Sequence, residues 1–180
     1  MKLYRDARKM LDKLVYDKAE YIKAVYGIFE AYTENESVYI NNIKFPMLRQ
    51  QKKNEKDQYL SLCDFVRPKT EGAIDYVGGF TVTAGVGANE LMSDYERHGD
   101  EYNVLLLKSV LERLAEAATE YLHAKIRKEY WGFSVEENLT AEEMFTLKYQ
   151  GIRPAVGYPS IPDQSINFLL NNDLLQSKEI

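Results

Sequence analysis

Hydrophobic and polar residues follow two different periods along the chain, and the change of period separates the first predicted elements. Apolar side chains recur at spacings of three and four from Leu3 to Ile22, which predicts an amphipathic helix. Residues 24–32 are instead rich in β-branched and aromatic side chains, which predicts a strand. Three further runs of this kind are expected to be strands: 38–40 and 43–45 on either side of Asn41-Asn42, and 75–85. The paired glycines Gly78 and Gly79 in the last run suggest a bulge, or the close approach of another backbone or a ligand.

Helical spacing dominates the second half of the chain. From Asn89 the pattern is helical almost to Tyr130, with Gly99 as the expected break between a short and a long helix. A capping box that begins at Thr140 starts a further helix, which should run to about Tyr149, and one more short helix ends the chain. Because strands come first and helices later, we predict an α+β fold. It should contain an antiparallel twisted sheet flanked by helices, with one long central helix.

Composition and charge narrow the functional classes. The 180 residues suffice for one domain, and the formal net charge of -5 argues against nucleic acid or an anionic membrane surface as the main partner. A single cysteine excludes an intramolecular disulfide and a cysteine-rich zinc site, and two histidines are too few for most histidine-rich metal sites. No apolar run approaches the length of a membrane span, and the first residues do not resemble a signal peptide. We therefore expect a soluble cytoplasmic protein without a metal centre.

The isolated histidines and the cysteine have ordinary structural interpretations. His98, just before Gly99, suits the carbonyl end of a helix. His123 is expected to pair with a nearby carboxylate or to be half-exposed. Cys63 lies in a mostly apolar segment and is expected to be a small core residue rather than a nucleophile.

The least ordinary segment is the loop of residues 150–163. It contains three of the five prolines and two of the ten glycines of the chain, so it should be rigid before any ligand arrives. Arg153 offers a planar fork suited to a carboxylate or phosphate. Gly157 permits close approach to the main chain, and Tyr158 provides a flat face with a polar tip. These features predict a rigid anion-binding loop; the alternative is a packed connection between helices in which Arg153 bonds a neighbouring acid.

The run from Tyr149 to Pro159 strongly resembles the S-adenosylmethionine-binding loop in the activation (reactivation) domain of cobalamin-dependent methionine synthase. Seven more segments are similar to this family and occur in the same order: 10–14, 48–51, 64–66, 100–103, 113–117, 120–123 and 130–132. The loop motif is specific, whereas the other segments gain weight as an ordered set. After Asp163 the family usually continues with His, Thr, Glu and Lys. Here residues 164–167 read Gln-Ser-Ile-Asn, so no role of that histidine or lysine carries over.

The resemblance implies a function and a site. In that family the domain binds S-adenosyl-L-methionine, and a flavodoxin-like donor supplies an electron, so that inactive cob(II)alamin is converted back to methylcobalamin. The resemblance implies that Arg153 binds the carboxylate in the methionyl part of S-adenosyl-L-methionine and that the backbone around Ala155 contacts the ligand. Gly157 and Tyr158 would complete this side of the ligand site. Glu116 matches an acid near the family's ligand site, where it could favour the amino group or the sulfonium charge; taken alone, it looks like solvated helix surface. No residue is expected to be catalytic, because methyl transfer belongs to the cofactors.

The resemblance also implies a larger enzyme, a methyltransferase of methionine biosynthesis. Cobalamin would be held by a neighbouring domain, which is then a partner of this chain together with the flavodoxin-like electron donor. Because the family's domains are longer, we expect residues 1–180 to form a single domain. It would be an incomplete activation domain, truncated at both ends and inactive alone. Two other functions stay open: a docking module that presents the acidic helices and the Lys52-Lys53 turn to a protein, and a binding protein that uses the Arg153 loop for another small carboxylate.

Overall fold

The computed structural model describes residues 2–17 and 21–177 and divides into two compact units. Of the described residues, the helical unit comprises 2–17, 21–24 and 82–148, and the sheet unit comprises 25–81 and 149–177. That residues 1–180 form a single domain stays a prediction.

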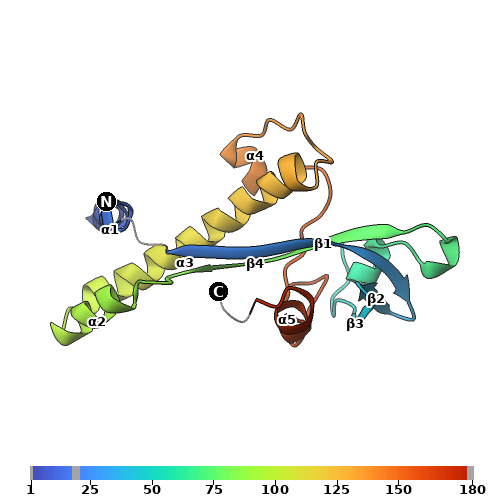
Figure 1. Cartoon of the computed structure of the whole chain (residues 1–180), viewed down its shortest axis with the longest axis horizontal. Coiled ribbons are helices and arrows are strands. Elements are labelled where there is room, and N and C mark those ends of the chain that lie inside the picture. Colours follow the sequence, from blue (N-terminus) through green and yellow to red (C-terminus); the bar gives the residue numbers. More distant parts are fainter. Residues whose placement is uncertain (1, 18–20, 178–180) are drawn as a thin grey trace. The chain divides into compact units, whose positions relative to one another are not determined.

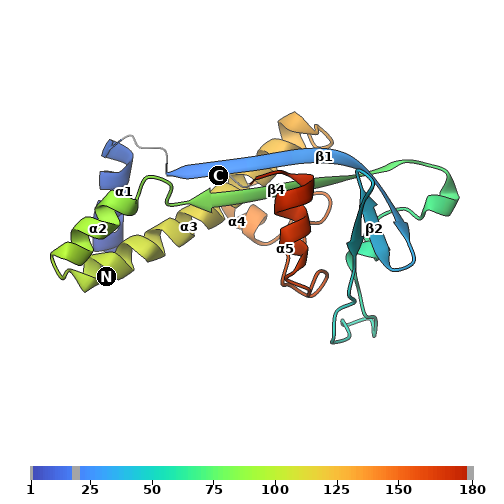
Figure 2. The same ribbon diagram turned by 60° about the horizontal axis from the view of Figure 1, so that its bottom comes forward.

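The sheet contains the four strands expected from the sequence. They are β1 (Ile22–Glu34), β2 (Ser37–Ile40), β3 (Ile43–Pro46) and β4 (Asp75–Ala84), hydrogen-bonded in the order β3-β2-β1-β4. Figure 2 shows β4 running beside β1 in the opposite direction. Two-residue turns with positive φ angles join the first three strands: Asn35 and Glu36 in one, Asn41 and Asn42 in the other. Such turns match the twist of paired strands, and asparagine tolerates their left-handed backbone.

The helical unit is built around one long helix (Figure 1). Its helices are α1 (Lys2–Asp17), α2 (Asn89–Arg97), α3 (Glu101–Lys125) with the wider turn η3 (Ile126–Tyr130), and α4 (Ala141–Phe145). Both α1 and α2 pack against α3, and the core between them includes Met10, Leu14 and the completely buried Leu107. The predicted break at Gly99 is confirmed by its φ of +66°. The side chain of Asp100 then caps α3. The long helix and the α+β class are thus confirmed.

Helix α1 ends earlier than predicted. Its apolar spacing suggested a helix as far as Ile22, but α1 ends at Asp17 and Ile22 is already the first residue of β1; residues 18–20 lie outside the described part. The carbonyl oxygen of Tyr21 accepts a hydrogen bond from the backbone N–H of Gly85 at 2.7 Å. Pairing with the segment that follows β4 therefore replaces the helical hydrogen bonds at this point.

Helix α4 is also shorter than the expected run to about Tyr149. The capping box is present as predicted: the Thr140 hydroxyl accepts the backbone N–H of Glu143, and the Glu143 carboxylate accepts that of Thr140. However, Leu147 has a φ of +58°, a left-handed conformation that ends a helix. The sequence shows where α4 begins, because the capping box is a recognisable pattern. It does not show where α4 ends, because this C-terminal turn lacks the usual glycine.

The sheet unit has its own core, formed where β2 and β3 meet three short helical segments. Those segments are η1 (Leu62–Phe65), α5 (Ile166–Phe168) and η4 (Leu169–Leu174); a further turn is η2 (Lys69–Glu71). Val38 and Phe45, which are register partners, are at most 1% exposed at its centre. Cys63 packs against this core, as predicted. A Cβ on Gly79 would lie 3.3 Å from Leu170, so the close approach suggested by the paired glycines is that of a side chain.

Candidate ligand-binding site

The loop of residues 150–163 folds into a tight turn within the sheet unit. The backbone N–H of Gly157 donates to the carbonyl oxygen of Ile161 at 2.8 Å, and that of Ile161 donates to Tyr158 at 2.9 Å. The N–H of Tyr158 in turn donates to the carbonyl of Ala155 at 3.2 Å. Three backbone hydrogen bonds within seven residues thus close this turn, and its rigidity before ligand binding stays a prediction.

Contacts with the rest of the sheet unit hold this turn in place. Ile161 is buried in the core and Val156 packs against it. The carbonyl oxygen of Ser160 accepts a hydrogen bond from the N–H of Leu62 at 3.1 Å. Gly157 has a φ of +91°, and a Cβ there would lie 3.4 Å from the side chain of Gln164. Glycine is therefore the residue that this turn requires.

The structure brings four of the five predicted site residues together in this loop. Arg153 is half-buried, with its Nη1 atom completely buried, whereas Ala155 and Gly157 are exposed. Tyr158 is 68% exposed. A guanidinium fork, an accessible main chain and an aromatic face thus follow one another along a rigid segment. That combination can bind a small molecule that has a carboxylate at one end.

The loop ends at a carboxylate that is used structurally. The backbone N–H of Ser165 donates to Oδ1 of Asp163 at 2.8 Å. The hydrogen bonds from Ser165, first from its side chain and then from its backbone, hold the pKa of the Asp163 carboxyl below its usual range. Asp163 therefore stays ionised and fixes the step from the loop into α5.

Glu116, the fifth predicted residue, belongs to the helical unit. It lies on α3 with an exposed side chain, and its Oε2 atom is 2.6 Å from Nη1 of Arg113. This is an ion pair of the kind expected on a solvated helix face. A ligand role for Glu116 stays a prediction.

Sequence reasoning missed a buried ionic cluster at the end of α3. His123 is buried rather than half-exposed, and its Nδ1 atom lies 2.6 Å from Nη1 of Arg127. Arg127 is 1% exposed and binds both oxygens of Glu137. Helical spacing relates His123 to Arg127, but no local pattern relates either of them to Glu137.

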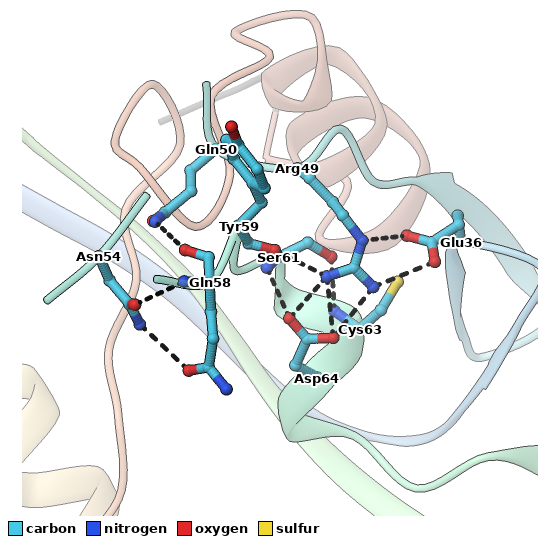
Figure 3. Close-up of polar contacts among 9 residues, drawn as sticks. All are labelled: Glu36, Arg49, Gln50, Asn54, Gln58, Tyr59, Ser61, Cys63 and Asp64. Carbon is cyan, nitrogen blue, oxygen red and sulfur yellow. Dashed lines mark hydrogen bonds and ion pairs between the residues drawn. The ribbon is translucent and has the colours of Figure 1, made fainter. Parts of the chain in front are cut away.

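A second missed cluster lies in the sheet unit, where Arg49 binds the carboxylates of Glu36 and Asp64 (Figure 3). Two of the segments that resemble the methionine synthase family, 48–51 and 64–66, contain the two ends of the Arg49–Asp64 pair. The resemblance was the available signal, but it did not indicate that the two segments touch.

Comparison with known proteins identifies the family. A family model described as vitamin B12 dependent methionine synthase, activation domain, matches residues 1–180. The chain belongs to this family. Among solved structures, this activation-domain chain is similar to the MetH reactivation domain in a crystal structure with AdoHcy bound, with 38% identity and a TM-score of 0.88. The match covers 97% of this chain and 56% of that one, so this chain spans about half the length of that relative.

The described part of the activation-domain chain offers neither a metal centre nor a membrane span. Within residues 2–17 and 21–177, no three His, Cys, Asp or Glu side chains are grouped so that they could hold a metal ion. No helix in the same ranges is long and apolar enough to cross a bilayer.

Proposed function

We propose that this chain is the S-adenosylmethionine-binding part of the activation module of a cobalamin-dependent methionine synthase. The observation that carries the proposal is the similarity, at 38% identity, to a reactivation domain that has AdoHcy bound. AdoHcy is S-adenosylhomocysteine, which remains when S-adenosylmethionine gives up its methyl group. The family match over residues 1–180 supports the same function.

The loop of residues 150–163 supplies the binding groups. Arg153 binds the carboxylate of the methionyl part, because its planar guanidinium can donate two parallel hydrogen bonds. The exposed main chain at Ala155 and Gly157 contacts the ligand, and the exposed ring of Tyr158 forms one wall. Glu116 would favour the ligand's amino group or sulfonium charge, and its ion pair with Arg113 would then have to open.

In the whole enzyme, the chain binds and orients the methyl donor. Cobalamin, held by a neighbouring domain, supplies the methyl-accepting metal centre, and a flavodoxin-like donor supplies the electron for reductive reactivation. Positioning and electrostatics are the contributions of this chain, which has no reaction of its own. Its cellular role is to keep a cytoplasmic methyltransferase of methionine biosynthesis active.

Calorimetric titration of the full chain with S-adenosylmethionine tests the proposal. We expect Arg153→Ala to weaken binding by about 10- to 100-fold, the loss expected for a charge-assisted pair of hydrogen bonds. Arg153→Lys should recover part of the affinity, because lysine keeps the charge but not the fork. Arg67→Ala, which removes an exposed arginine from the same unit, is the matched control and should bind as the wild type does. Absence of binding by the wild type, both in this chain and in the whole enzyme, would refute the function, and tight binding by Arg153→Ala would refute the role of that residue.

A further inference from the structure

Arg49 lies at the centre of a polar cluster in the sheet unit (Figure 3). Its Nη1 atom lies 3.0 and 2.9 Å from the two carboxylate oxygens of Asp64, and its Nε atom lies 2.8 Å from Oε2 of Glu36. The same Nη1 atom donates to the carbonyl oxygen of Tyr59 at 2.9 Å. One guanidinium thus joins the turn before β2, the segment before η1 and η1 itself.

Asp64 uses the same carboxylate to shape η1. Its Oδ2 atom accepts the backbone N–H of Ser61 at 2.9 Å, and the Ser61 hydroxyl accepts the N–H of Cys63 at 3.1 Å, so the two residues form a capping box. With four residues, η1 has few backbone hydrogen bonds of its own. Its geometry therefore depends on this cap. The hydrogen bonds from Arg49 are the main cause that holds the pKa of the Asp64 carboxyl below its usual range, so the cap stays charged.

Helix η1 then reaches the candidate binding loop directly. The residue after Ser61 is Leu62, whose backbone N–H donates to the carbonyl oxygen of Ser160 at 3.1 Å. Leu62 and Ile161 are both buried in the same core. A continuous set of contacts therefore runs from Arg49 through Asp64 and η1 to the turn of residues 157–161, entirely within the sheet unit.

We propose that Arg49 and Asp64 are positioning residues for ligand binding. They hold η1 so that Leu62 fixes the turn of residues 157–161 beside Arg153. The inference rests on the proposed function, because the turn is the predicted wall of the S-adenosylmethionine site. The side chains of Arg49 and Asp64 are 37% and 31% exposed, but their ion pair is bidentate and shares Arg49 with Glu36, so it also contributes to stability. The test must therefore separate an effect on binding from an effect on folding.

The test compares Asp64→Ala with a matched control by calorimetry and by amide hydrogen exchange. We expect Asp64→Ala to weaken S-adenosylmethionine binding about tenfold. This is the effect of losing a charge-assisted hydrogen bond from the contacts that position the turn. Arg49→Lys should weaken binding less than Asp64→Ala does, because lysine retains one charge contact. Lys53→Ala is the control: it removes the Lys53–Asp57 ion pair of the segment between Arg49 and η1, and it should leave the affinity unchanged.

Amide exchange separates local loosening from unfolding. In Asp64→Ala the amides of Leu62, Gly157 and Ile161 should exchange faster, whereas the paired amides of β2 and β3 should keep their wild-type rates. If the strand amides also exchange faster, Asp64→Asn, which keeps the shape of the side chain, replaces Asp64→Ala in the same comparison.

Each outcome decides one question. Equal affinities of the wild type and the Asp64 variant, or unchanged exchange at Leu62 and Gly157, would overturn the positioning role and leave the proposed function intact. A wild type that binds S-adenosylmethionine neither in this chain nor in the whole enzyme would overturn the proposed function itself. Weaker binding by Lys53→Ala to the same degree would show a general charge effect and would also overturn the positioning role.

Discussion

Removing the carboxylate of Glu137 should destabilise the helical unit more than removing any exposed charged side chain. Nε of Arg127 lies 2.8 Å from Oε2 of Glu137, while Nη1 lies 2.6 Å from Nδ1 of His123. The side chains of Arg127 and Glu137 are 1% and 9% exposed, so Glu137→Ala removes a carboxylate that a buried guanidinium binds. Breaking a buried ion pair in this way costs about 3–5 kcal/mol. Because Glu137 lies at the rim, where water can enter, we expect about 3 kcal/mol, the lower end of that range.

Urea unfolding followed by tryptophan fluorescence measures this loss. Trp131 is the single tryptophan of the chain and its ring packs edge-on against Phe133, next to the segment that carries Glu137. In a separate thermal unfolding experiment, the midpoint temperature should fall by about 10 °C, since 1 kcal/mol corresponds to roughly 2–4 °C at this chain length. Glu129→Ala is the matched control, because it removes the exposed Lys125–Glu129 pair from the same end of the long helix. Equal shifts for Glu137→Ala and Glu129→Ala, or a Glu137→Ala loss below about 0.5 kcal/mol, would refute the reasoning.

Two further predictions concern stability at low pH and the substitution of Gly157. Hydrogen bonds from Arg127 and Arg49 are the main causes that lower the pKa values of Glu137 and Asp64 in the folded state. Their contribution to the unfolding free energy is therefore complete above the ordinary carboxyl pKa of about 4 and is lost as the pH falls below it, through the lowered folded-state pKa values; urea midpoints that stay constant from pH 7 to 3 would contradict this. Gly157→Ala should weaken S-adenosylmethionine binding and lower stability by about 1 kcal/mol or more, because its φ is +91° and Gln164 lies against it. In the control Gly72→Ala, the φ is also positive but no atom lies within 4 Å, so equal binding losses in calorimetry would argue against a steric cause.

The elements that the sequence predicted correctly are those with a local cause. The strands flanking Asn41-Asn42 follow from alternation and a turn that asparagine favours, and α4 begins at its capping box. The two errors concern helix ends. Helix α4 ends before a left-handed Leu147, where the usual glycine is missing. Ile22 belongs to β1, next to a backbone hydrogen bond between Gly85 and Tyr21, and a helical spacing that continues through Ile22 contains no sign of that partner.

Proline spacing and the family resemblance pointed to the loop around Arg153, and the structure describes how that loop folds. The ligand roles of its residues stay predictions. Arg49 and Asp64 are fifteen positions apart, at a separation that matches no helical or strand period. Charged residues are usually exposed, so composition also gave no reason to expect a buried Arg127.

The order of the binding loop is a property of the fold more than of its prolines. Each proline restricts one φ angle, but the turn itself is closed by hydrogen bonds between residues 155 and 161 and is attached to the core through Ile161. The bond from Leu62 to Ser160 comes from a segment remote in sequence. A free peptide with the sequence of residues 150–163 would therefore have to order itself during binding, and that entropy cost would weaken its affinity. The recognisable motif specifies which groups the loop exposes, and the surrounding sheet unit holds them in one geometry.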